Sequence, residues 1–249
     1  MNSLLTVYST LKGCFSIVLD QKAMGRYNQV VKTLIFSDTH FSQKIDQARL
    51  QKLANLIEEA DQVIINGDFF DSYLISFSDF LETGWKELFK LLQPKTIYIH
   101  GNHDPSHKTD QRTMLFSQQQ LDDFDLKEGK YKLHIEHGHR LSPSLDGMWP
   151  ALIESLDYFY PWWLRFEGEL AKKLVPIGWV LDSKRQTKNW QMAWGVKNWP
   201  TNHVLIAGHS HLPYQTRHYF NPGRFSTKTA RYIWIENGEI ERVEVPLES

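Results

Sequence analysis

Histidines and acidic residues recur in five short clusters along the chain. The clusters read Ser37-Asp38-Thr39-His40, Asn66-Gly67-Asp68-Phe69-Phe70-Asp71, Gly101-Asn102-His103-Asp104, His137-Gly138-His139 and Gly208-His209-Ser210-His211. They offer carboxylates, imidazoles and an amide without any thiolate, a set that suits Mn²⁺, Fe or Zn²⁺. One tetrahedral catalytic ion uses three protein ligands, so these donors are too many for it. Two ions that share a carboxylate would use them all, and such a pair clamps both oxygens of an in-line displacement.

Each cluster follows a short apolar run that is typical of a β-strand. The runs are Thr33–Phe36, Val63–Ile65, Thr96–Ile99, Tyr131–Ile135 and Val204–Ala207. In open α/β sheets, sites form outside the carboxyl ends of the strands. We therefore expect the five clusters to meet at one place.

Helical patterns and a hairpin complete the expected elements. Apolar residues at positions 50, 53, 54 and 57 predict an amphipathic helix, and the spacing over 81–92 predicts a second one that stops before Pro94. Near the C-terminus, the runs 231–235 and 240–245 flank Asn237-Gly238, which predicts a type I′ hairpin. The order of elements favours an α/β domain whose sheets are flanked by helices.

The composition is that of an ordinary globular chain. Of 249 residues, 41% are hydrophobic and 23% charged, and the formal net charge of −1 gives no global attraction for nucleic acid or an anionic membrane. Nucleic acid is therefore not an expected partner. The single cysteine, Cys14, excludes a disulfide framework and fits a reducing compartment, so we expect a cytoplasmic location.

The N-terminal residues stand apart from this pattern. No run reaches the length that a membrane span needs, and residues 1–30 lack the charged start of a signal peptide. We interpret them as a loosely attached extension, with Met24 as an alternative start. A membrane-surface anchor is the other interpretation.

In their order along the chain, the clusters resemble the motifs of the calcineurin-like metallophosphoesterase family: D-x-H, G-D-x-x-D, G-N-H-D/E, H-G-H and G-H-x-H. The resemblance runs from Leu34 to about Gly223, within a phosphoesterase domain that we place at 31–249. It implies a four-layer α/β/β/α sandwich with two divalent ions. Mn²⁺ is the expected metal, and Fe, Zn²⁺ or Ni²⁺ are alternatives.

The resemblance also implies a role for each matching residue. The metal ligands would be Asp38, His40 and His211 for the first ion, Asn102, His137 and His209 for the second, and Asp68 as the bridge. His103 matches the catalytic histidine, and Asp104 would orient it or help to set its pKa. Asp71 matches a motif position that has no settled ligand role.

The sequence contains further histidines and an arginine near the motifs. His100 and His139 match no ligand position and are expected to support the ligands from behind. The remaining histidines that we assign to surface or core are His107, His134, His203 and His218. Arg224, after the turn Asn221-Pro222-Gly223, reaches either the phosphate or a structural partner. Taken alone, each cluster is also ordinary turn or helix-cap chemistry, but five in order after five strands favour a shared site.

The segment 143–200 holds seven of the nine tryptophans and is predicted to be a helical cap insertion. Its place is similar to that of the long insertion in the UDP-2,3-diacylglucosamine hydrolase subgroup, which cleaves a pyrophosphate on a lipid A precursor. That similarity implies a lipid-linked or nucleotide-linked substrate and allows peripheral membrane contact. The subgroup tends to have arginine where this chain has His103. The alternative for the tryptophans is an ordinary aromatic core.

The positive charges of the insertion also indicate a phosphate-bearing substrate, because Lys184, Arg185 and Lys188 could hold a second phosphate group. The sequence therefore predicts a dinuclear-metal hydrolase that cleaves a phosphoester or pyrophosphate bond by attack of a metal-bound hydroxide. A nuclease of the same family is an alternative, but it needs a basic groove, and the insertion has seven Lys/Arg against six Asp/Glu. A non-catalytic metal-binding scaffold would lack a ligand or His103, and none is missing. No feature indicates the oligomeric state.

Overall fold

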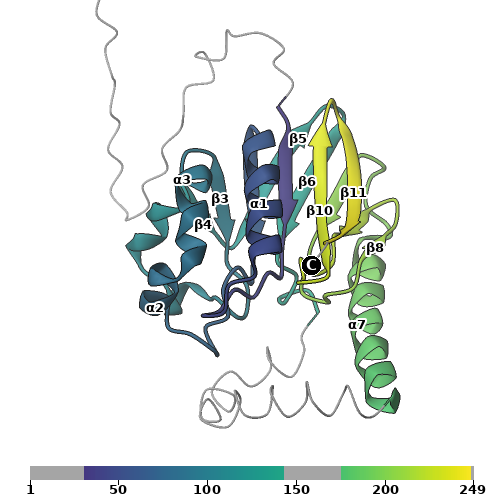
Figure 1. Ribbon diagram of the computed structural model, residues 1–249. Helices are drawn as coiled ribbons and strands as arrows, with labels where there is room; N and C mark the ends of the chain where they lie inside the picture. The colour runs from purple at the N-terminus through teal and green to yellow at the C-terminus, as the bar shows by residue number, and fades with distance from the viewer. Residues whose placement is uncertain (1–30, 143–174, 248–249) are drawn as a thin grey trace, which may run out of the picture.

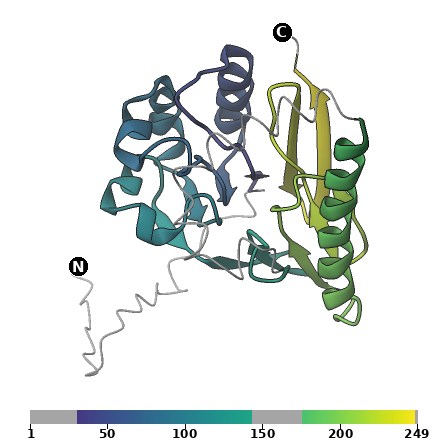
Figure 2. The same ribbon diagram turned by 90° about the horizontal axis from the view of Figure 1, so that it is seen from below.

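The computed structural model describes residues 31–142 and 175–247, with side chains from Ser183 onward in the helix that begins at Val175. Two β-sheets stack face to face in this part of the chain (Figure 1). Helices of the first half cover one outer side, and a long helix, α7 (Val175–Val196), covers the other (Figure 2). The predicted four-layer α/β/β/α sandwich is confirmed.

The first sheet has six strands in the order β11-β10-β1-β2-β3-β4. Their bounds are β1 (Thr33–Phe36), β2 (Gln62–Asn66), β3 (Thr96–Ile99), β4 (Gln119–Leu121), β10 (Thr229–Glu236) and β11 (Glu239–Pro246). Strands β1 to β4 are parallel, and β10 joins β1 in antiparallel orientation. The clusters that follow β1, β2 and β3 therefore leave the sheet at the same edge.

The second sheet has the order β5-β6-β7-β9-β8. Its strands are β5 (Asp123–Glu128), β6 (Tyr131–Glu136), β7 (His203–Ile206), β8 (Tyr214–Gln215) and β9 (Tyr219–Asn221). Strands β6 and β7 are parallel neighbours, so the clusters that follow them also share an edge. The five predicted strands are confirmed to within about a residue at their ends, whereas β4, β5, β8 and β9 were not predicted.

Successive side chains of a strand point to opposite faces of its sheet, so three apolar layers form between the four layers of helices and sheets. On β1, Leu34 and Phe36 belong to the cluster that contains the first helix, while Ile35 packs in the cluster between the sheets with Ile135 and Ile206. Beyond the second sheet, Met192 of α7 packs in a third cluster with residues of β7 and β9. Because both faces of the central strands are covered, their runs are continuously apolar.

The predicted helices differ in how regular they are. The first, α1 (Gln47–Glu59), is confirmed, and the Asp46 side chain caps it by accepting a hydrogen bond from the Arg49 N–H (2.9 Å). The second is divided into α2 (Phe77–Glu82), a 3₁₀ turn η2 (Gly84–Leu88) and α3 (Phe89–Leu92).

The division of that helix has a local cause. Thr83 has extended backbone (ψ 166°), and Gly84 packs so closely against Ile45 that an added Cβ would lie 2.1 Å from its Cδ1. The apolar spacing is kept across the break, because Trp85 and Leu88 are buried with the residues on either side. Two further 3₁₀ turns, η3 (Ser106–Lys108) and η4 (Gln111–Leu115), follow β3. The type I′ hairpin is confirmed, since Asn237 and Gly238 both have positive φ (55° and 74°).

Part of the predicted insertion lies outside the described residues, namely 143–174 with Trp149, Trp162 and Trp163. The N-terminal extension 1–30 with Cys14 also lies outside them. The described part of the insertion is α7, whose second half packs on the second sheet through Met192 and Val196. None of the helices in 31–142 and 175–247 combines the length and apolar character that crossing a bilayer requires.

One ion cluster on the second sheet gives a testable pH dependence. His134 on β6 lies 3.5 Å from Glu136 Oε1 and 2.7 Å from Asp125 Oδ1. These carboxylates, Glu136 foremost, outweigh burial and raise the pKa of His134 to about 9. Because the folded-state pKa lies above the usual 6.5, the stabilisation is complete below about pH 6.5 and is lost as the pH rises through 9.

We therefore expect His134→Gln to lower the free energy of unfolding at pH 6 and to cost much less at pH 9.5. Urea unfolding at the two pH values, followed by circular dichroism, measures the difference. An equal loss at both pH values would contradict the ion pairing.

Candidate metal centre

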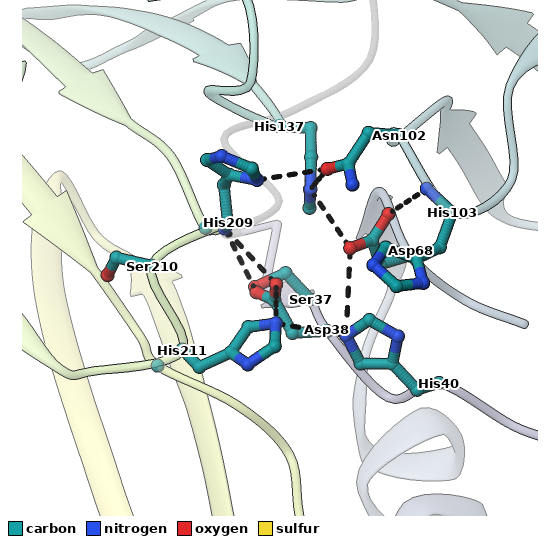
Figure 3. Close-up of polar contacts among 12 residues, drawn as sticks. Ser37, Asp38, His40, Asp68, Asn102, His103, His137, His209, Ser210 and His211 are labelled. Atoms are coloured by element: carbon teal, nitrogen blue, oxygen red, sulfur yellow. Dashed lines mark hydrogen bonds and ion pairs between the residues drawn. The ribbon is translucent and has the colours of Figure 1, made fainter. Parts of the chain in front are cut away.

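The five clusters converge where the carboxyl ends of β1, β2 and β3 face those of β6 and β7, and Asp68 lies at their centre (Figure 3). Asp68 Oδ1 accepts a hydrogen bond from the His103 N–H (2.8 Å). Its Oδ2 lies 3.6 Å from His40 Nε2 and 3.2 Å from His137 Nε2. This buried oxygen has no hydrogen-bond partner within the described part of the chain. An oxygen in that position suits a cation.

On one side of Asp68, three further ligand atoms come together. His40 Nε2 and His211 Nε2 are 3.0 Å apart, and His211 Nε2 is 3.4 Å from Asp38 Oδ1. With the Asp68 carboxylate, these atoms all lie within 4.8 Å of one another. Two imidazole nitrogens bound to one ion at about 2.0–2.1 Å each lie roughly 3 Å apart, so the spacing fits a shared ion.

On the other side of Asp68, an amide oxygen joins two imidazoles. Asn102 Oδ1 lies 3.2 Å from His137 Nε2 and 2.9 Å from His209 Nδ1. Because His137 Nε2 is also near Asp68 Oδ2, that carboxylate oxygen stands between the two groups. The residue set predicted from the sequence is thus brought together as two groups around one carboxylate.

The loops that carry these side chains have unusual backbone. Left-handed φ values between 45° and 63° occur at Asp38, His40, Asp68, His209 and His211. Such conformations cost about 1–3 kcal/mol for a non-glycine residue and concentrate at functional sites. Cross-loop hydrogen bonds hold them: the Asp38 N–H donates to Gly67 O (3.1 Å) and the His40 N–H to Asp68 O (2.9 Å).

Glycine is required where two loops approach Asp68 and His137. A Cβ on Gly101 would lie 2.2 Å from Asp68 Oδ1 and 2.5 Å from the Asp68 backbone nitrogen. A Cβ on Gly67, which has φ 78°, would lie 2.4 Å from His137 Nδ1. Gly67 and Gly101 therefore let these loops approach His137 and Asp68 more closely than a residue with a Cβ could.

The contacts of Asp104 and Asp71 differ from what the sequence suggested for Asp104. Asp104 was expected to orient His103, but its Oδ1 accepts from the N–H groups of Gly101 (2.7 Å) and Asp68 (3.0 Å), and its Oδ2 from that of Phe69 (2.6 Å). It ties the loop after β3 to the loop after β2. The carboxylate on the His103 ring is that of Asp71, whose Oδ1 lies 3.1 Å from His103 Nδ1.

Asp71 also reaches a ligand residue, because its Oδ2 lies 3.6 Å from His40 Nδ1. One buried carboxylate thereby orients two imidazoles whose Nε2 atoms remain for a metal or a substrate. The sequence signal for this role is the second aspartate of G-D-x-x-D, a motif position to which the resemblance assigns no settled ligand role. Asp71 follows Asp68 by three residues on the same loop, and it lies on the Nδ1 side of His40 and His103.

A further shell surrounds these groups. His100 Nδ1 is 3.0 Å from Asp104 O, and the His139 ring packs beside His137 with centroids 5.6 Å apart. The Arg224 N–H donates to His211 O (3.1 Å), and its Nε is buried without a partner in the described residues. From α7, Lys188 Nζ reaches to 3.0 Å from His209 Nε2. The histidines that lie outside the cluster are His107, His134, His203 and His218.

The charges of the site act on one another strongly. Burial raises the pKa of Asp38, whereas His137 and His103 overcome burial and hold the pKa of Asp68 well below its usual value. In return, against burial, Asp68 raises the pKa of His137 to about 10. Burial lowers the pKa of His211, and it does the same for His40 and His209. A cation bound here would take the place of the His137 proton, so metal binding should release protons.

The chain matches the model of the calcineurin-like phosphoesterase family over residues 31–226, and it belongs to that family. Members of this family use divalent metal ions, in agreement with the candidate metal-binding cluster. No curated protein matched the sequence.

Solved structures with a similar fold have low sequence identity. An archaeal phosphodiesterase is 17% identical with a TM-score of 0.46, over 87% of this chain and 99% of its own. The phosphoesterase YfcE from E. coli is 18% identical with a TM-score of 0.44, over 87% and 100%. Vacuolar protein sorting 29 from Cryptosporidium parvum is 10% identical with a TM-score of 0.41, over 88% and 99%.

Replacement of the central carboxylate tests the metal centre. We expect Asp68→Asn to lose at least one divalent ion per chain and nearly all turnover, because an amide removes the charge between the two groups. Metal content after dialysis measures the first effect and a phosphodiester assay the second. Asp122→Asn, at an exposed aspartate, is the matched control. Two ions and full activity in Asp68→Asn would exclude a bridging role.

His103 should act on the substrate and leave the metals in place. We expect His103→Asn to lower kcat by about 10²–10⁴ with unchanged metal content, the range for loss of a general acid or base. Asp71→Asn should lower kcat in the same direction, since it removes the carboxylate on His103 Nδ1. If metal content falls in proportion to activity, His103 is a ligand instead.

Proposed function

We propose that this protein hydrolyses a phosphoester or pyrophosphate bond at a centre of two divalent ions. Asp38, His40 and His211 would hold one ion, Asn102, His137 and His209 the other, and Asp68 would bridge them. The observation that carries this proposal is the buried Asp68 Oδ2, which faces ligand nitrogens of both groups without a hydrogen-bond partner in the described chain. We propose Mn²⁺ as the native metal, as the family resemblance implies; the imidazole, carboxylate and amide donors also suit Fe or Zn²⁺.

When bound, two such ions supply positive charge for the phosphoryl oxygens and a nucleophilic water of lowered pKa. The protein's own residues orient the substrate and the proton donor. His103, engaged through Nδ1 by Asp71, offers Nε2 to the leaving oxygen and can deliver a proton there. Asp104 fixes the backbone from which Asn102 and His103 project, since it holds the Gly101 N–H. The charge of Arg224 is near enough to His211 to lower the pKa of that histidine, and it would bind the non-bridging oxygens of the substrate.

The finer proposal concerns the substrate. A diphosphate linked to a lipid or a nucleotide agrees with the cations that α7 brings to the site, of which Lys188 contacts His209. It also agrees with the tryptophan content of 143–200, which suits an amphipathic ligand. Contact with a membrane surface and a cytoplasmic location would be consistent with such a substrate.

Metal analysis combined with a substrate panel tests the proposed reaction. The full chain, loaded with Mn²⁺, is assayed on bis(p-nitrophenyl) phosphate, p-nitrophenyl phosphate and UDP-glucose. We expect cleavage of the diester and of the diphosphate, and loss of both with a chelator. Absence of turnover with two bound ions would overturn hydrolysis and favour a scaffold role.

The lipid part of the proposal has its own test in residues outside the described ranges. Replacing Trp162 and Trp163 by Ala should raise KM for a lipid-linked diphosphate, because their rings would hold the acyl chains. Cleavage of bis(p-nitrophenyl) phosphate should be almost unchanged. Equal losses on both substrates, or a lower unfolding temperature, would assign these tryptophans to a core.

A further inference from the structure

Asn189 of α7 is an amide buried where that helix packs on the second sheet. Among the buried side chains of α7 from Ser183 onward it is the polar one, and Met192 beside it is apolar. Its Oδ1 accepts hydrogen bonds from the hydroxyls of Ser210 and Tyr219 (2.9 Å each), and its Nδ2 donates to Leu212 O (3.1 Å). Burying an amide is costly unless such partners are present, so these contacts account for a polar residue at this position.

A second amide extends this network to the start of the loop that follows β7. Asn221, at the end of β9, has its Nδ2 3.0 Å from Asn189 Oδ1, and the same nitrogen donates to Gly208 O (2.8 Å). The side chains of the network, which are those of Asn189, Ser210, Tyr219 and Asn221, are fully buried. Hydrogen bonds that are shielded from water are stronger, so the network links α7 firmly to the loop.

The network contacts the loop on both sides of each histidine that the loop carries. Its contact points are Gly208 O, the Ser210 hydroxyl and Leu212 O. His209 and His211 are the residues between these points, and both have left-handed backbone with φ 63°. A residue other than glycine keeps that conformation only where its surroundings hold it. The network therefore fixes the backbone from which both imidazoles project.

The same loop supplies one histidine to each expected ligand group (Figure 3). His209 Nδ1 lies 2.9 Å from Asn102 Oδ1 in the second group, whereas His211 Nε2 lies 3.0 Å from His40 Nε2 in the first. On the side of the first sheet, Asp38 Oδ1 accepts from the His209 N–H (3.1 Å), and on the opposite side the network supports the loop. A shift of this backbone would displace a ligand from both groups at once.

We propose that Asn189 is a positioning residue of the metal centre. Through its partners on the loop after β7, it holds the backbone in the conformation that directs His209 and His211 to different ions. This rests on the proposed function of the same centre. It makes α7, which belongs to the predicted insertion, part of the support of both ions. Asn189 lies 21 residues before Ser210 in the sequence and outside the five clusters, so no local motif indicates it.

Mn²⁺ binding to the full chain tests this role without recourse to turnover. Isothermal titration with Mn²⁺ compares wild type, Asn189→Leu, Ser210→Ala and Val196→Ala. Asn189→Leu replaces the amide by an apolar side chain of the same branching, and Ser210→Ala removes the partner on the loop. Val196 packs in the third apolar cluster, so Val196→Ala loosens the packing of α7 without removing a hydrogen bond of the network and is the matched control.

We expect Asn189→Leu to weaken the binding of both ions by about tenfold or more, the effect of losing a partner behind a metal ligand. Ser210→Ala should weaken both in the same direction. The double variant should lose less than the product of the two single effects, because each change removes the same contact. Val196→Ala should lower the unfolding temperature and leave the Mn²⁺ affinity unchanged.

Electron paramagnetic resonance of the Mn²⁺-loaded protein gives a second readout, since the coupling between two Mn²⁺ ions depends on how their ligands are placed. We expect an altered coupling in Asn189→Leu and the wild-type coupling in Val196→Ala. Equal Mn²⁺ affinities in these two variants, or an effect of Asn189→Leu on one ion alone, would overturn the positioning role.

Two further outcomes keep this role separate from the proposed hydrolysis. If Asn189→Leu does not fold, Ser210→Ala decides, and unchanged Mn²⁺ affinity in that variant overturns the positioning role. If wild type binds two Mn²⁺ ions with the expected variant effects but cleaves no ester, the hydrolysis fails and the positioning role stands. Fewer than two ions bound to wild type would overturn both.

Discussion

Asp68 Oδ2 is a buried carboxylate oxygen without a hydrogen-bond partner in the described chain, and the rest of the centre is arranged around it. Burying an unpaired polar group costs about 1–3 kcal/mol, more when it is charged, so it persists only where neighbours offset it. Here His137, His103 and His40 offset it, and they hold the pKa of this carboxyl well below its usual value. These three histidines belong to three different strand-end loops. The two sheets must therefore keep those loops in contact for Asp68 to remain charged.

Backbone contacts keep the loops in place. The Asp104 carboxylate accepts hydrogen bonds from three backbone N–H groups and thereby joins the loop after β3 to the loop after β2. Two of the residues with left-handed backbone are linked by a hydrogen bond, which the His209 N–H donates to Asp38 Oδ1 (3.1 Å). The apolar layers beneath the loops, in which β1 and β2 are buried on both faces, offset the energetic cost of this left-handed backbone.

Charge is distributed unevenly across the centre. The carboxylates of Asp38, Asp68 and Asp71 come from loops of the first sheet, whereas the second sheet and α7 contribute imidazoles and the cations of Lys188 and Arg224. Cations held near the first sheet would leave the second-sheet side positive. An anionic ligand would therefore be attracted to the second-sheet side of the site.

Local pattern in the sequence predicted the strands, the type I′ turn at Asn237-Gly238 and the family, because apolar runs, glycines and motif order are properties of neighbouring residues. It also predicted which side chains meet, since parallel strands bring their carboxyl ends to one edge. The short edge strands β4 and β8 lack enough residues to form a pattern, and the break at Gly84 depends on Ile45, which is distant in sequence. The roles of Asp71 and Asp104 were decided by tertiary structure alone. Both follow a strand in a motif, but only the packing of one loop behind another determines which carboxylate faces an imidazole and which faces backbone N–H groups.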